Sequence, residues 1–179
     1  AVSKNPRSTV ATVTEIYDYL RVLFANLGTP HCPGCGREVE AQSAQEIVDR
    51  VAALPVGARF QILAPLARNR KGAYQQTFAQ ARAQGFVRVR VNGTVRDVND
   101  EIVLDKRKKH DIDVVVDRLV VPREKAKRAG FVSRLTDSVE VALHTGEGRL
   151  VIDQGDKGEL LFSEEHACPH CHISFPKLT

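Results

Sequence analysis

The segment Phe86-Val87-Arg88-Val89-Arg90-Val91-Asn92-Gly93 sets the fold class of this chain. Apolar and charged residues alternate along it, which predicts a strand with one apolar face and with Arg88 and Arg90 on the other face. Asn92-Gly93 follows directly and is the strongest short signal for a β-hairpin, whose return strand we place at 94–98. The segment therefore predicts antiparallel strands.

On either side of this hairpin, strands and helices alternate without a regular rhythm. Further strands are expected at 59–64 and 111–121, and a second hairpin at 149–152 and 159–162. Helical spacing and end signals predict four helices, at 8–27, 43–54, 73–84 and 132–144. Ser43 and Glu46 form a capping box at the start of the second of these helices. The pattern indicates an α+β fold, with a small mixed or antiparallel sheet, hairpins and flanking helices.

The charged residues between and within these elements offer no catalytic constellation. The stretches 65–72 and 123–130 are predicted to be basic loops. Asp111, Asp113 and Asp117 alternate along the strand at 111–121, so we interpret them as an exposed strand face rather than as catalytic carboxylates. The sequence holds no phosphate-binding glycine loop, nucleophile elbow or zinc-protease motif. We therefore expect that this chain is not an enzyme.

The composition is that of a globular domain with a basic centre. The chain has 179 residues, 42% hydrophobic and 27% charged, and no apolar stretch of membrane-spanning length. Residues 59–110 hold 12 Lys and Arg against 4 Asp and Glu, a net charge of +8. Such a segment indicates an acidic partner, either nucleic acid or a protein surface. Arg88 and Arg90 are candidates for recognition, because arginine pairs with carboxylates through two hydrogen bonds.

Four cysteines occur in two CxxC pairs, Cys32/Cys35 and Cys168/Cys171, with 132 residues between them. Each pair forms a Cys-Pro knuckle, and two such knuckles can complete a tetrahedral, structural Zn²⁺ site. A redox role would need a CxxC that opens a helix, and metal-free thiols are the remaining alternative. This cysteine usage is not that of a secreted disulfide framework, which favours a reducing, cytoplasmic location. The knuckles are expected as stubs at the base of the α+β domain.

Several segments, in order along nearly the whole chain, resemble one protein family. They are 5–21, 28–33, 70–72, 85–90, 108–110, 114–118, 159–163 and 167–171. Together they resemble UvrA, the DNA-damage-sensing component of the bacterial UvrABC excinuclease. The chain contains no methionine, and we read it as a piece of a longer protein, an insertion that follows the first ATP-binding motif of a protein of this family.

The resemblance implies a partner and the residues that contact it. In this family the insertion binds UvrB, the helicase-like protein to which damaged DNA is passed. Its charged contacts would fall on Arg88, Arg118 and Asp137, and the strand pattern adds Arg90. ATP hydrolysis, DNA binding and homodimerisation would belong to the whole ABC-type ATPase. For the metal, the family leaves two ligand sets, because the second CxxC pair can also join a further pair beyond Thr179.

These inferences divide the chain into three parts. Residues 1–40 are expected to be a remnant of the ATP-binding domain with the first knuckle, 41–163 the UvrB-binding domain, and 164–179 the second knuckle. The alternative is a zinc-containing nucleic-acid-binding module that grips duplex DNA through the basic segment 59–110. A grip on DNA spreads its energy over many phosphate contacts, whereas a protein interface concentrates its energy in a few residues.

Overall fold

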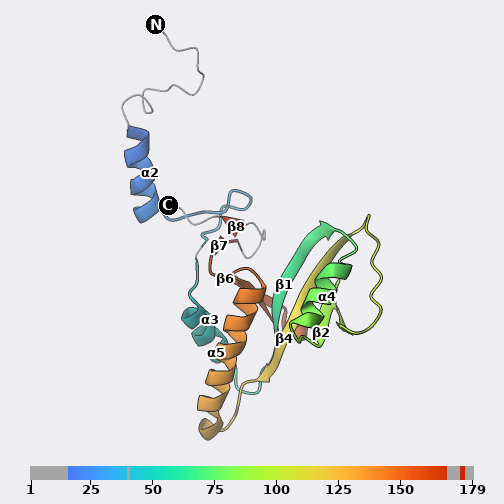
Figure 1. Cartoon of the computed structure of the whole chain (residues 1–179). Helices are drawn as coiled ribbons and strands as arrows, with labels where there is room; N and C mark the ends of the chain where they lie inside the picture. The colour runs from blue at the N-terminus through green and yellow to red at the C-terminus, as the bar shows by residue number, and fades with distance from the viewer. Residues whose placement is uncertain (1–15, 40, 169–173, 176–179) are drawn as a thin grey trace. The chain divides into compact units, whose positions relative to one another are not determined.

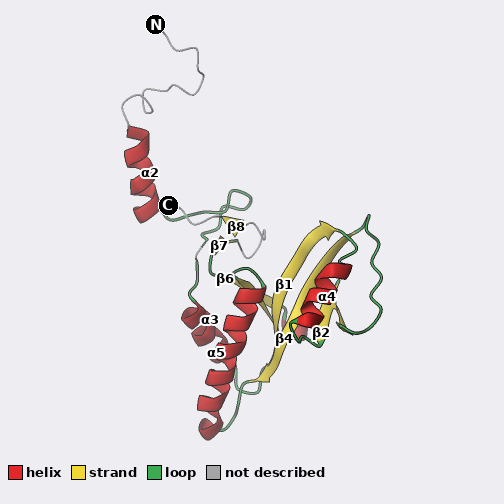
Figure 2. Cartoon of the chain, in the orientation of Figure 1, coloured by secondary structure: helices red, strands yellow, loops and turns green. Residues whose placement is uncertain are grey.

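The computed structural model describes residues 16–39, 41–168 and 174–175. The chain divides into two compact units, one formed by residues 41–165 and the other by residues 1–40 together with 166–179. Figure 1 and Figure 2 show the helices and strands of both units. No helix within the described ranges is long and apolar enough to cross a membrane.

The unit at 41–165 is built on a six-stranded sheet with the strand order β3-β2-β4-β1-β5-β6. Every pairing in this sheet is antiparallel. The strands are β1 (Arg59–Lys71), β2 (Arg88–Val91), β3 (Thr94–Asp97), β4 (Lys109–Val120), β5 (Arg149–Asp153) and β6 (Glu159–Ser163). Both predicted hairpins are present, as β2–β3 and β5–β6. The α+β fold is confirmed, and the sheet is antiparallel rather than mixed.

Three helices cover one face of this sheet (Figure 2). They are α3 (Ala44–Ala52), α4 (Gln75–Ala83) and α5 (Arg128–Thr145). The capping box is formed as predicted, with Ser43 Oγ accepting from the Glu46 amide and the Glu46 carboxylate accepting from the Ser43 amide. Buried residues of all three helices join one core with alternate residues of the strands, such as Ile62 on β1 and Leu150 on β5. That alternation places the core on a single face.

Two predicted loops are in part regular structure. The prediction of a loop at 65–72 is wrong, because β1 continues through Pro65 to Lys71 beside β4. β5 pairs with β1 only at Gln61–Leu63, so at Pro65 the strand β1 has a neighbour on one side only. A proline, which has no backbone N–H to donate, is tolerated at such a position because its nitrogen can face the unpaired side. The loop expected at 123–130 is replaced from Lys125 onward by a short 3₁₀ turn, Lys125–Lys127, and by the start of α5.

The sheet is strongly curled toward its second face. β2 and β6 are four strand spacings apart, about 19 Å in a flat sheet. Yet the guanidinium of Arg90 on β2 contacts the carboxylate of Glu159 on β6, and their side chains together cannot bridge that width. Register shifts between β1 and β4 supply the bend. The concave second face buries Leu63, Val115 and Val151 as a small separate cluster.

The other unit contains α2 (Ile16–Leu27), β7 (His166–Ala167) and β8 (Ser174–Phe175). The helix predicted at 8–27 is confirmed from Ile16 onward, and positions 8–15 lie outside the described residues. Between α2 and residue 39 the chain turns tightly at Cys32, whose amide donates to the carbonyl of Arg37 and whose carbonyl accepts from the amide of Gly36. This turn is the expected first knuckle.

Candidate functional site

A surface groove gathers two of the predicted partner-binding residues, Arg88 and Arg118. Arg88 opens β2 and Arg118 lies near the end of β4, and both are exposed. The two strands are neighbours in the sheet, and these two residues, 30 positions apart in sequence, line the same groove. The groove has a volume of about 350 Å³ and is lined by Gly85, Phe86, Val87, Arg88, Val115, Val116, Asp117, Arg118 and Arg134.

Arg134 and Asp117 form one wall of this groove and tie α5 to β4. Arg134 donates to both carboxylate oxygens of Asp117, from Nη2 to Oδ1 at 2.7 Å and from Nε to Oδ2 at 2.8 Å. The Arg118 amide and the Ser138 hydroxyl also donate to this carboxylate. Burial acts to raise the pKa of Asp117, but these hydrogen bonds outweigh it and hold the pKa below its usual value. Sequence reasoning missed Arg134, whose partner lies 17 residues away on another element.

The Asp117 anchor predicts a pH-dependent stability. A carboxyl group with a depressed folded-state pKa contributes stability above its unfolded pKa of about 3.9 and loses it as the pH falls through the folded value. We therefore expect Asp117→Asn to lower the urea midpoint at pH 7, and the difference from the unmodified chain to shrink when measured at pH 3. Asp137→Asn, an exposed change on the same helix as Arg134, is the control. A difference that is equal at the two pH values would contradict this assignment.

Arg90 lies two residues after Arg88 on the same face of β2, but its environment is different. Its exposed fraction is 7%, so the expectation of an exposed arginine face is correct for Arg88 and wrong for Arg90. The reason is the curl of the sheet, which folds β5 and β6 over this position. Its direct contact with a partner stays a prediction, while its contacts inside the domain are extensive.

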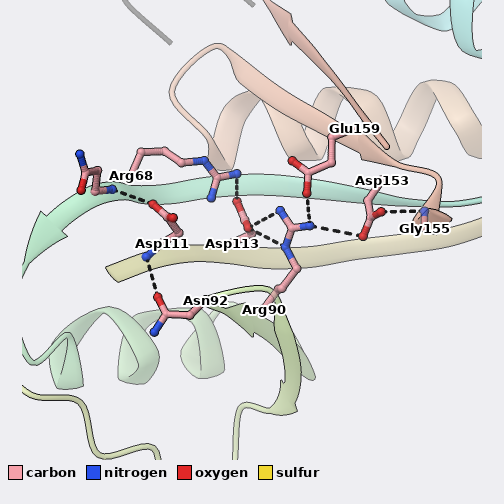
Figure 3. A network of polar contacts seen from close by, with 9 residues as sticks. Arg68, Arg90, Asn92, Asp111, Asp113, Asp153, Gly155 and Glu159 are labelled. Carbon is pink, nitrogen blue, oxygen red and sulfur yellow. Dashed lines mark hydrogen bonds and ion pairs between the residues drawn. The ribbon is translucent and has the colours of Figure 1, made fainter. Parts of the chain in front are cut away.

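The guanidinium of Arg90 joins three carboxylates from three strands (Figure 3). Nε and Nη2 contact Oδ2 of Asp113 at 2.9 and 2.8 Å, and Nη1 contacts Asp153 at 3.3 Å and also Glu159. Arg68 on β1 forms an ion pair with the other oxygen of Asp113. Burial acts to lower the pKa of Arg90, but Asp113 and Glu159 outweigh it and raise the pKa above its usual value. Arg90 therefore stays charged, and its ion pairs join β2 to β4, β5 and β6 across the concave face of the sheet.

Asp113 is the second correction to the strand prediction. It was expected on an exposed face with Asp111 and Asp117, but only 1% of it is exposed. Asp111 is exposed, as predicted, and Asp117 is partly buried. Strand alternation correctly placed Asp113 opposite Ile112 and Val114. Alternation alone could not show that the sheet face opposite the helices, where Asp113 lies, is concave and buried.

Asp137, the third residue implied by the resemblance, is exposed on α5. It follows Arg134 by three positions, which on a helix places the two side chains on neighbouring turns. It is not among the residues that line the groove. The structure thus places Arg88 and Arg118 together and leaves Asp137 on the adjoining helix.

Three of the four predicted metal ligands lie together in the other unit. The sulfur atoms of Cys32, Cys35 and Cys168 are all within 4.8 Å of one another, and the Sγ atoms of Cys35 and Cys168 are 3.5 Å apart. The edge of a tetrahedral zinc–thiolate site is about 3.8 Å, from Zn–S bonds of about 2.3 Å. The donor set therefore fits a metal ion. Cys171, the fourth predicted ligand, lies outside the described residues.

The molecule is thus an α+β domain that carries a charged groove, accompanied by a unit that carries a cluster of thiols. The chain belongs to the UvrA interaction domain family, whose model matches residues 42–156. It is 51% identical over 176 residues to UvrABC system protein A of Bacillus subtilis and to that of Lactococcus lactis, and 50% identical over 177 residues to that of Clostridium acetobutylicum. These alignments cover 98% of the chain but 18% of each relative.

Proposed function

We propose that residues 41–165 bind UvrB during nucleotide excision repair, and that the groove between β2, β4 and α5 is the contact surface. One observation carries this proposal. Arg88 and Arg118, which the resemblance names as contacts, come from separate segments and line the same groove. The family name supports an interaction role, because the matched model is described as the UvrA interaction domain.

The charges of the groove suit an acidic partner surface. Three arginines line it, at positions 88, 118 and 134, against the single carboxylate of Asp117. That carboxylate is already engaged by Arg134. Within the part of the chain that the structure describes, Arg88 and Arg118 form no ion pair, so their guanidinium groups are available for carboxylates of a partner. Val87 is 57% exposed at the same groove and adds apolar contact area.

Asp137 and Arg90 contribute to this surface in different ways. Asp137 offers a negative charge on the adjoining helix, which would pair with a lysine or arginine of the partner. Arg90 holds β2 against β4, β5 and β6, which determines where Arg88 stands. We therefore assign Arg90 as a positioning residue of the same surface.

Calorimetric titration of this chain into purified UvrB at near-physiological salt tests the proposal. Saturable binding with one site per chain is the expected result. The rival function, a DNA grip through residues 59–110, predicts instead that duplex DNA alone is bound and that UvrB gives no heat above dilution. If UvrB does not bind at any concentration tested, the proposed function fails.

We propose that the thiol cluster holds one structural zinc ion. Cys168 lies beside both cysteines of the first pair, which supports a site shared between the two CxxC pairs, with Cys171 as the fourth ligand. Four thiolates leave no open position, so the ion would stabilise the fold and would not catalyse. It would tie residues 32–35 to residues 168–171, the two segments that precede and follow residues 41–165 in the chain.

Removal of the metal gives a direct prediction. Mercurial titration of the thiols should release about one zinc ion per chain, measured with a chromogenic chelator. Cys35→Ser, which removes one member of the cluster, should lower the bound zinc severalfold. An unchanged zinc content in Cys35→Ser, or a chain purified with no zinc from zinc-supplemented cells, would contradict the shared site. Zinc release should also lower the urea midpoint of residues 41–165, although that unit contains none of the three cysteines, because the ion closes the chain on both sides of that unit and so restricts its unfolded state.

The role in the longer protein follows from the relatives. Each of them is named UvrABC system protein A, and the chain spans 18% of their length. We propose that a whole protein of this kind uses ATP to load UvrB at lesions in DNA, as an ABC-type ATPase. This chain would supply the recruiting surface and none of the ATP chemistry.

A further inference from the structure

One end of the sheet carries a dense cluster of cations that lies apart from the groove. The end of β1 lies beside the start of β4, with Arg70 opposite His110 and Lys71 opposite Lys109. We call the cluster formed there the basic end. Its six members are exposed: Arg70, Lys71, Lys106, Arg107, Lys108 and Lys109. The basic end thus joins two runs of sequence that are more than 30 residues apart.

The two carboxylates nearest in sequence to this cluster are occupied by backbone groups. Asp105 accepts from the Arg107 amide at 2.9 Å, and Asp111 accepts from the Asn69 amide at 2.7 Å. Among the described residues, no ion pair involves any of the six cations. Lys71 also lies directly opposite Lys109 in the β1–β4 ladder, an arrangement that is unfavourable for like charges. The fold therefore gains no ion pair from these charges and bears their mutual repulsion.

The backbone beneath the basic end is held by hydrogen bonds through the side chains of His110 and Asn92. The buried ring of His110 lies within hydrogen-bond distance of the Asp105 carbonyl through Nε2, at 2.9 Å, and of the Asn92 amide nitrogen through Nδ1, at 3.1 Å. Since a carbonyl only accepts, Nε2 carries the proton and Nδ1 accepts from Asn92. Asn92 in turn accepts from the Asp111 amide (Figure 3). These hydrogen bonds tie the loop that carries the lysines to the start of β4 and to the turn between β2 and β3.

We propose that the basic end is a second interaction surface, which binds the phosphate backbone of duplex nucleic acid. Its chemistry favours phosphates over a protein surface, since four of the six cations are lysines, which are depleted in the cores of protein interfaces. The six members are four lysines and two arginines, and the cluster itself contains no aromatic ring. Tyr74 is half-buried nearby, with its ring against His110 and its hydroxyl donating to the Arg70 carbonyl. Without a stacking platform, single strands gain no extra affinity.

The basic end and the groove are separate surfaces. Lys109 and Arg118 are nine positions apart on β4, which corresponds to about 30 Å of extended strand. The chain could therefore contact UvrB through the groove while the basic end lies on DNA. The two surfaces are testable independently, because no residue is common to both.

The test measures binding of this 179-residue chain to a fluorescently labelled duplex of random sequence, over a series of salt concentrations. The tip variant is Lys106→Gln/Lys108→Gln/Lys109→Gln. The matched control is Lys125→Gln/Lys127→Gln/Lys157→Gln, which removes the same number of exposed charges elsewhere. If each of these three lysines of the basic end contacts one phosphate, the magnitude of the slope of log affinity against log salt should decrease by about 2.7 in the tip variant. Its affinity at low salt should fall roughly tenfold or more, and the control should stay within about twofold.

Three results would overturn the proposal. The first is that the unmodified chain does not bind duplex DNA at low salt. The second is that the control loses as much affinity as the tip variant, which would indicate binding through net charge alone. The third is that the tip variant keeps DNA binding but loses UvrB binding, which would assign the basic end to a protein partner. Thermal unfolding of the tip variant excludes misfolding, because removal of mutually repelling charges should not lower the midpoint.

Discussion

Arg90→Ala should lower the free energy of unfolding of residues 41–165 by about 3 kcal/mol, at the lower end of the cost of breaking a buried ion pair. The change leaves Asp113, of which 1% is exposed, with Arg68 as its remaining ion-pair partner. It also leaves Asp153 and Glu159 as neighbouring negative charges without the cation between them. For a domain of this size, the expected loss corresponds to about 10 °C in the thermal midpoint.

Urea denaturation of three variants measures this effect. Arg88→Ala is the matched control, because it removes the same side chain two residues earlier on the same strand face, where it is exposed. We expect it to change the free energy of unfolding by no more than about 0.5 kcal/mol. Arg90→Ala/Asp113→Ala should recover part of the loss, since it removes the uncompensated charge along with its partner. Equal free energies of unfolding for Arg90→Ala and Arg88→Ala would show that the ion pairs of Arg90 do not stabilise the sheet.

Arg88→Glu/Arg118→Glu should weaken binding to UvrB at least about 100-fold. Each charge-assisted pair contributes about 1.5–3 kcal/mol, and reversal of the charge adds repulsion toward the same partner carboxylates. The effect rests on the proposed function and is measured by the same calorimetric titration. Both side chains are exposed and form no described ion pair, so the fold should be retained.

The control for this prediction is Lys125→Glu/Lys157→Glu, which makes the same change in net charge at exposed positions outside the groove. It should leave UvrB affinity nearly unchanged. An affinity of the arginine variant within about threefold of the unmodified chain would remove Arg88 and Arg118 from the interface. DNA binding by the arginine variant should persist, because the basic end lacks both residues.

Local signals in the sequence were sufficient for most of the fold. Asn92-Gly93 predicted the hairpin correctly because a tight turn needs positive φ angles, and these two residues adopt φ values of 48° and 82°. Ser43 and Glu46 marked the start of α3 because a capping box is complete within four residues. The prediction that the strand ends before Pro65 was wrong. The energetic cost of a proline in a strand depends on how many neighbouring strands pair with it at that position, and this number is not a local property of the sequence.

For the candidate site, the sequence determined which residues carry charge and which face of a strand they occupy. The pattern Val-Arg-Val-Arg places Arg88 and Arg90 on one face, and alternation places Asp113 opposite the apolar core. It could not distinguish the exposed Arg88 from the buried Arg90. Only the packed sheet separates them, since its curl brings β5 and β6 over one arginine and leaves the other at the open end. Burial depends on which distant strands approach a residue, and that approach is a property of the whole sheet.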